Sequence, residues 1–153
     1  MALEFNTIGI RLKYAVEASA GTRPTSSYTE IPDIKAIPEI AMTPSNLDVT
    51  NLVDPYKRYI PGVKDAGNDI ALTANLTADL KTKWNACVAA AQSAWNSGKL
   101  TYFEISIPNY DSFYFAGMPS ELGLSAMGVD AVVEAQLHVI PNLIAGWASA
   151  SST

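Results

Sequence analysis

The sequence is short of the residues from which most enzyme and metal sites are built. Cys87 is the only cysteine among 153 residues, so no disulfide can form within the chain, and one thiol is too few for a thiolate metal site. His138 is the only histidine, which excludes a metal site or a proton relay that needs two histidines. We therefore expect no metal and no cofactor.

Charge and long apolar runs are also scarce. Only 16% of the residues are charged, the formal net charge is −5, and the lysines and arginines form no basic run. Proteins that bind nucleic acid through their surface usually carry a basic patch. The apolar runs are too short to span a membrane, and the first six residues do not resemble a signal peptide. We expect one soluble domain over residues 1–153, made in a cytoplasm.

The remaining polar residues do not form a recognisable catalytic pattern. A serine hydrolase would have to use His138 as its base, and the chain has no Gly-x-Ser-x-Gly motif. A pair of carboxylates could serve a glycosidase, but most β-proteins of this length contain as many. The segment 65–69 lacks the alternating ligands of a calcium loop. We expect a protein that is not an enzyme.

Alternating apolar and polar residues predict several strands. The first, over 5–16, places Ile8, Leu12 and Val16 on one face, and the last, over 131–140, does the same with Val133, Leu137 and Val139. The other predicted strands cover 70–76, 100–107 and 110–118, with two short extended pieces within 28–42 that contain prolines.

One segment has the apolar periodicity of a helix. An apolar stripe runs from Leu80 through Trp84 and Cys87 to Trp95. Thr77 is a suitable N-cap and Gly98 a suitable terminator. Strands outnumber helices, so the expected class is mainly β: a β-sandwich or barrel with one packed α-helix. The last residues, 148–153, are expected to be a flexible tail.

The stretch 46–67 fits neither pattern. It is interrupted by prolines and glycines, which disfavour a regular strand ladder. It nevertheless carries more apolar side chains than a free linker would. Such a loop is buried either against another chain or against its own domain, and the residues alone leave both possibilities open.

This stretch carries a resemblance. Asp48-Val-Thr50, Arg58-Tyr-Ile-Pro-Gly62 and Asp65-Ala-Gly67 are similar to a signature of the major tail tube proteins of long-tailed, siphovirus-type bacteriophages. The order of elements resembles that family over about residues 5 to 147. The resemblance implies the tail-tube fold, which is similar to that of the type VI secretion tube protein. It also implies hexameric rings that stack into the virion's tail tube, the conduit for DNA ejection.

The resemblance also implies partners and contact residues. A tape measure protein would lie inside the tube, tail terminator and tail tip proteins would bind its ends, and DNA would pass without specific binding. The contacts between rings would come from the loop 46–67, with Asp48 and Arg58 as candidate partners across the interface. The expected contact residues are Leu47, Asp48, Val49, Thr50, Leu52, Tyr56, Arg58, Tyr59 and Ile60.

A channel for DNA needs a wall that does not bind phosphates. Two polar strand faces have acidic and neutral residues only, and we expect them to line the channel unless they lie on the outside of the tube. They comprise Glu104, Ser106, Glu134, Gln136 and His138. Two other functions remain possible at this point: a β-sandwich binding module, such as a capsid decoration or adhesin domain, and a type VI secretion tube protein.

Overall fold

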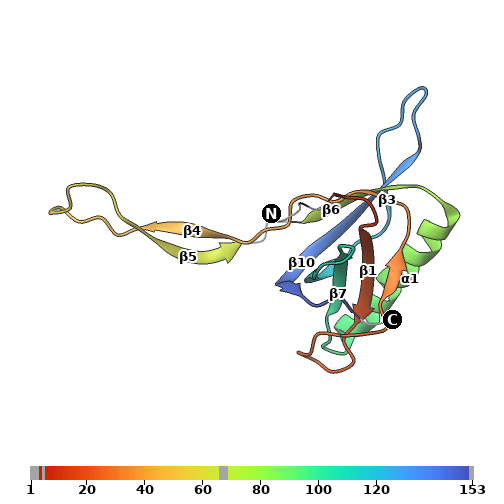
Figure 1. Cartoon of the computed structure of the whole chain (residues 1–153), viewed down its shortest axis with the longest axis horizontal. Coiled ribbons are helices and arrows are strands. Elements are labelled where there is room, and N and C mark those ends of the chain that lie inside the picture. The colour runs from red at the N-terminus through yellow and green to blue at the C-terminus, as the bar shows by residue number, and fades with distance from the viewer. Residues whose placement is uncertain (1–3, 5, 66–68, 152–153) are drawn as a thin grey trace.

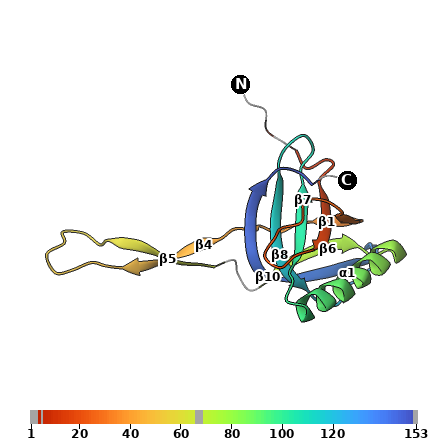
Figure 2. The same ribbon diagram turned by 90° about the horizontal axis from the view of Figure 1, so that it is seen from below.

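The computed structural model describes residues 4, 6–65 and 69–151. Most strands belong to one strongly curved sheet with the order β2-β1-β7-β8-β10-β6-β3, and β9 also pairs with β10. Figure 2 shows this sheet curling around the core, with the helix α1 along its side. The strands of the sheet are β1 (Arg11–Val16), β2 (Thr29–Ile31), β3 (Ile34–Ala36), β6 (Ile70–Asn75), β7 (Thr101–Ser106), β8 (Ser112–Pro119), β9 (Gly123–Leu124) and β10 (Glu134–Ala148).

The two ends of the sheet are formed by neighbouring pieces of chain. β2 pairs with β1 at one end, and β3 pairs with β6 at the other. Only Pro32 and Asp33 separate β2 from β3, so this segment brings the two ends of the sheet together. The result is a nearly closed, barrel-like sheet, and the predicted mainly β class with one packed helix is confirmed.

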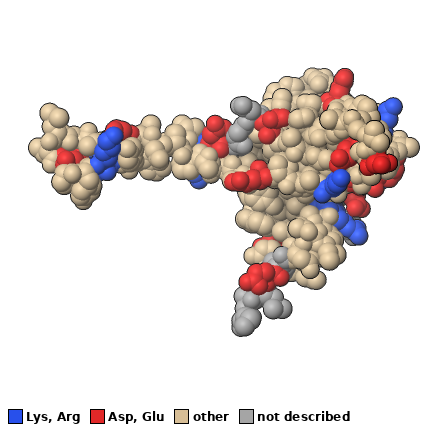
Figure 3. Space-filling view, turned by 90° about the horizontal axis from the view of Figure 1, so that it is seen from above, with Lys and Arg blue, Asp and Glu red and all other residues tan. Residues whose placement is uncertain are grey.

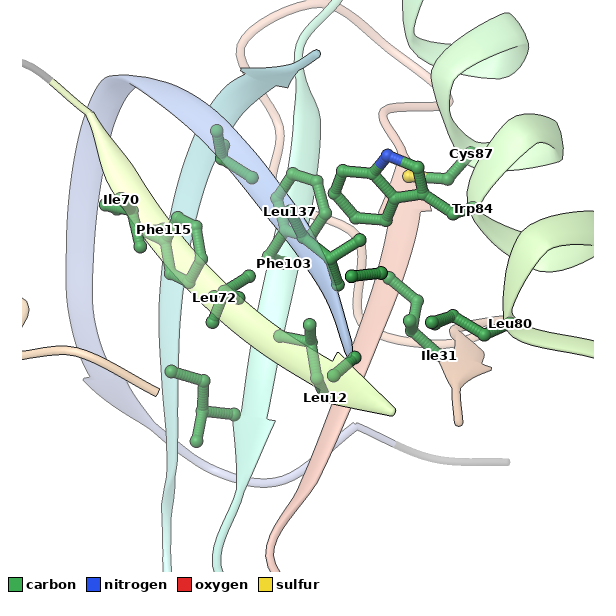
Figure 4. Close-up of a cluster of buried hydrophobic side chains, with 14 residues drawn as sticks. Leu12, Ile31, Ile70, Leu72, Leu80, Trp84, Cys87, Phe103, Phe115 and Leu137 are labelled. Carbon is green, nitrogen blue, oxygen red and sulfur yellow. The ribbon is translucent and has the colours of Figure 1, made fainter. Parts of the chain in front are cut away.

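The core fills the inside of this curved sheet. Phe103 on β7 stacks on Phe115 of β8 with ring centroids 5.3 Å apart, and Leu72 and Leu137 face each other across β6 and β10. All four are fully buried, and Figure 4 shows them beside the helix residues Leu80, Trp84 and Cys87. Strand alternation accounts for this core, because every second residue of each strand points inward.

The helix α1 (Ala78–Asn96) begins and ends as the sequence predicts. The Thr77 hydroxyl accepts a hydrogen bond from the Leu80 N–H, and Gly98 adopts a φ of 74° just beyond the helix. Trp84 is fully buried and its indole N–H donates to the Ser120 carbonyl over 2.9 Å. Burial raises the pKa of the Cys87 thiol to about 12, as expected for an inert core cysteine. Trp95, by contrast, is half exposed.

Several predicted strand limits are wrong at their ends. The first strand begins at Arg11 rather than residue 5, because residues 7–9 form a turn, and Ile8 is exposed. The last strand runs from Glu134 to Ala148, so Val133 lies outside it and is also exposed. Two register shifts against β8 let this long strand bend around the barrel.

The largest correction concerns the stretch 46–67, which is not a structureless loop. β4 (Thr43–Asp48) and β5 (Tyr59–Asp65) pair as an antiparallel hairpin that makes a separate two-stranded sheet. Figure 1 shows the hairpin as a long arm that leaves the body. Each of its strands pairs on one edge only, and proline is tolerated in such edge strands because its missing N–H costs no ladder hydrogen bond on the unpaired edge. The ladder also shifts register between Pro44 and Asn46. Residues 66 and 67 lie outside the described part of the chain.

Candidate functional site

The hairpin arm is the most unusual surface of the molecule, because it exposes large apolar side chains and projects away from the body (Figure 1). Leu52 is fully exposed at its tip and Val53 is 87% exposed. Figure 3 shows the arm as mostly uncharged, with a few charges toward its tip and its base. The other large apolar side chains exposed on it are Leu47, Val49, Tyr56, Tyr59, Ile60 and Val63.

All nine predicted contact residues lie on this arm, between Leu47 and Ile60. The structure therefore brings them together on one projecting element. Val53 and Val63 are not among the predicted contacts, although the side chains of both are highly exposed. The signal for them was present in the sequence, as valines in a segment already rich in apolar residues.

The tip of the arm is closed by the side chain of Thr50. The Arg58 N–H donates to the Thr50 hydroxyl oxygen over 2.8 Å, and the Val49 N–H donates to the Arg58 carbonyl over 3.1 Å. The Thr50 N–H in turn donates to Asp48 Oδ1 over 2.9 Å. The hydrogen bonds with Thr50 lower the pKa of the Asp48 carboxyl. The Asp-Val-Thr motif thus extends the hairpin beyond its last ladder pair.

Asp54 holds the other side of the tip. It accepts hydrogen bonds from the Asn51 N–H over 2.9 Å and from Arg58 Nε over 3.0 Å, and the latter contact is also an ion pair. Asp48 and Arg58 were predicted as partners of each other across an interface. In the structure each has a partner within its own hairpin tip, so their first role is to shape the tip.

Gly62 lets the two strands of the arm approach closely. A Cβ at this position would collide with the Ser45 hydroxyl and lie 3.2 Å from Leu47 Cγ on the opposite strand. The Ser45 hydroxyl could rotate away, but the Ser45 carbonyl oxygen would lie 3.3 Å from such a Cβ, which is tighter than an ordinary contact. The Ile-Pro-Gly motif therefore has a structural reason within the hairpin itself.

The predicted channel residues separate into two groups. Glu134, Gln136 and His138 alternate along β10 on the side opposite the core, where each has a partner. Glu134 pairs with Lys35 Nζ at 2.9 Å, Gln136 donates to Ser125 Oγ over 2.7 Å, and His138 Nδ1 lies 2.6 Å from Asp69 Oδ2. These three residues form one polar surface.

Glu104 does not belong to that surface, because its side chain is fully buried. The N–H and hydroxyl of Ser151 donate to its carboxylate over 2.9 and 2.7 Å, and the Tyr114 hydroxyl lies 2.8 Å from Oε2. Glu104 is therefore not an open-face residue in this chain, contrary to expectation. Ser106, two residues along β7, is partly buried.

The segment that covers Glu104 is the chain end that was expected to be a flexible tail. The Ser149 carbonyl lies 2.7 Å from the Tyr114 hydroxyl, and Ser151 bonds the Glu104 carboxylate on β7. We call residues 149–151 the C-terminal strap. Residues 152 and 153 of the predicted tail lie outside the described part of the chain.

Two further observations concern metal binding and membrane spans in the described part of the chain. Within residues 4, 6–65 and 69–151, no three histidine, cysteine, aspartate or glutamate side chains come together as a metal site would require. No helix in the described chain is both long enough and apolar enough to cross a membrane.

The fold, by contrast, has clear counterparts among solved structures. A chain in the cryo-EM structure of the anti-feeding prophage baseplate, 6-fold symmetrised, matches with a TM-score of 0.61 over 93% of this chain and 94% of its own, at 7% identity. A chain in the virion of a native gene transfer agent particle matches with a TM-score of 0.60 over 95% and 100%, at 14% identity.

A third match is to a chain in the tail of an empty gene transfer agent particle with C6 symmetry, with a TM-score of 0.54, 17% identity, and coverage of 97% and 98%. The fold is one found in tail assemblies. No protein-family model and no curated protein matches the sequence. At these identities the likeness concerns the fold, and it extends over nearly the whole of each chain.

Proposed function

We propose that this protein is the structural subunit of a phage tail tube, in which hexameric rings stack and the hairpin arm makes the contact between rings. The observation that carries the proposal is the arm itself. It exposes apolar side chains over its whole length, and exposed apolar surface of this extent marks an interaction site. Its own body cannot cover it, because the arm leads away from the body (Figures 1 and 2).

Free strand edges support the formation of rings. β10 pairs with β6 only as far as Val139, so among the described residues the segment 140–148 has no strand on that side. Unpaired edges invite pairing with another chain, and a closed ring of subunits would pair them all. The fold matches to chains of assemblies with six-fold symmetry favour six subunits.

The proposed tube would conduct DNA from a virion without binding it. Its wall would be formed by the polar surface of Glu134, Gln136 and His138, where Lys35 is paired with Glu134. A paired lysine adds less affinity for phosphate than a free one. A tape measure protein would occupy the tube during assembly, and terminator and tip proteins would bind its two ends.

The test is assembly of the purified protein. Sedimentation and negative-stain microscopy over a wide concentration range are expected to show rings or hollow tubes of constant diameter, with the fraction assembled rising with concentration. A protein that stays monomeric at the highest concentration, and forms no tubes when an initiating tail-tip complex is added, would contradict the proposal.

A further inference from the structure

A second apolar protrusion lies on the far side of the body from the hairpin arm. It comprises Leu124 at the end of β9 and the loop that leads from there to β10, residues 124–133 together, which we call the receiving loop. In Figure 1 it rises at the upper right of the body, whereas the arm extends to the left. Val129 is 95% exposed, and Leu124, Met127 and Val132 are more than half exposed. The sequence pattern predicts a connection before residue 131 and the start of the last strand from there on.

The receiving loop is held firmly at its base. The Ser125 N–H donates to the Glu134 carbonyl over 3.1 Å, and the Leu76 N–H donates to the Val133 carbonyl over 3.0 Å. The hydrogen bond from Gln136 to Ser125 adds a side-chain link. A loop fixed in this way presents its apolar side chains without a large loss of conformational entropy on binding.

The charges of the two protrusions are complementary. The receiving loop contains one charged residue, Asp130. The arm's tip, residues 49–59, has one carboxylate, Asp54, and two cations, Lys57 and Arg58. Asp54 pairs with Arg58, and the Asp48 carboxylate beside the tip accepts from the Thr50 N–H. Lys57 takes part in neither contact, and it is exposed.

We propose that the arm's tip docks on the receiving loop of a second copy of this chain, with Leu52 and Val53 against Met127 and Val129 and with Lys57 near Asp130. This inference rests on the proposed function and names the surface that accepts the arm. The arm's tip does not reach the receiving loop of its own chain, because the body lies between them (Figure 1). A head-to-tail contact between unlike surfaces leaves one arm and one loop free at the two ends of a pair, so it can repeat from ring to ring along a filament.

Cross-linking tests the contact directly. The protein has a single cysteine, Cys87, which is buried, so thiols introduced at the surface react without background. Leu52→Cys combined with Val129→Cys, treated with a short bismaleimide, is expected to give a ladder of covalent multimers once tubes have formed. The matched control is Leu52→Cys with Ala89→Cys, which places the second thiol on the exposed face of α1.

Charge reversal provides an independent test. Lys57→Glu and Asp130→Lys are each expected to raise the concentration needed for assembly by roughly two- to fivefold, as for a lost exposed ion pair. The double variant is expected to restore the wild-type value, and the effect of each single change is expected to fade at high salt.

The outcomes separate this inference from the proposed function. If the wild-type protein forms tubes but the multimer ladder appears only with the control cysteine pair, the docking site is overturned and the tube proposal stands. The same holds if the wild-type protein forms tubes but the double charge variant does not recover wild-type assembly. A wild-type protein that never assembles would overturn both.

Discussion

At the scale of single residues, Glu104 shows how hydrogen-bond donors accommodate a buried carboxylate. Its carboxylate is surrounded by donors from the C-terminal strap and by the Tyr114 hydroxyl. Hydrogen bonds of this kind replace the water that the carboxylate loses on burial. Since the donors come mainly from the strap, Glu104 is also the residue that holds the chain end on the sheet.

Replacing Glu104 by glutamine is therefore expected to destabilise the protein. The amide would place an N–H group where the carboxylate oxygen now accepts from Ser151 or Tyr114, and one such buried mismatch costs about 1–3 kcal/mol. Urea unfolding followed by fluorescence measures the change. The control is Glu134→Gln, since its exposed ion pair with Lys35 is worth at most about 1 kcal/mol. If both substitutions lower the free energy of unfolding equally, the hydrogen bonds between Glu104 and the C-terminal strap contribute no more to stability than the exposed ion pair does.

The same carboxylate predicts a dependence on pH. Burial by itself would raise the pKa of Glu104, but the hydrogen bonds from Ser151 and Tyr114 outweigh it and lower the pKa below the ordinary 4.5. A group with a lowered folded-state pKa contributes stability above its unfolded pKa, and this contribution is lost as the pH falls through the folded value. Below about pH 4.5 the strap is expected to loosen, which amide exchange at Ser151 would detect in wild type and not in Glu104→Gln, where the strap is already loose.

The error at Glu104 has a physical cause. Alternation along residues 100–107 correctly places Phe103 and Ile105 inward and Glu104 on the other face. What alternation cannot report is a segment that arrives from 47 residues later in the chain and covers that other face. Polar faces are assigned to water by default, so a strap made of serine and alanine leaves no signal.

At the scale of elements, the hairpin arm depends on the close approach at Gly62. Gly62→Ala is expected to push β5 slightly away from Ser45 on β4 and to loosen the arm, because the added methyl group would displace the Ser45 hydroxyl and lie 3.3 Å from the Ser45 carbonyl oxygen. The melting temperature of the body is expected to stay the same while assembly weakens. Amide exchange along the arm would show faster exchange than in wild type.

The control is Gly123→Ala on β9, where the added methyl group meets its neighbours at ordinary contact distances, so exchange along the arm is expected to stay the same. If Gly62→Ala also leaves this exchange unchanged, the role of Gly62 is contradicted.

The helix and the hairpin differ in how well the sequence predicts them. The helix has an unbroken apolar stripe, a threonine cap and a terminal glycine, and all three features are local. The hairpin contains Pro44 and Pro61, which would be excluded from the centre of a sheet. In a two-stranded arm no strand is central. Whether a segment becomes a central strand or an edge strand depends on which other strands pack beside it, and its own residues do not report that. The receiving loop was missed for a related reason, since an apolar side chain in a connection is normally assumed to find cover.

At the scale of the whole molecule, body and arm are expected to be separable. Residues 49–58 can be replaced by Asn-Gly, since Asp48 and Tyr59 face each other at the end of the ladder and a two-residue turn of this type closes a hairpin. The arm contributes nothing to the buried core, so circular dichroism and melting temperature are expected to match those of wild type. Tube formation is expected to be lost. An unfolded body would show instead that the arm is part of the domain's stability.

The arm also has a consequence for how the chain folds. Its strands are close in sequence, and hairpins form in about 1–10 μs. Closing the barrel is slower, because it must bring Arg11 against Ser106 and distant pairings are slow to form. New chains therefore present a finished apolar tip before their body is closed, and at high concentration they are expected to associate prematurely through it. Cooling weakens apolar association, so expression at low temperature is expected to raise the yield of correctly folded subunits.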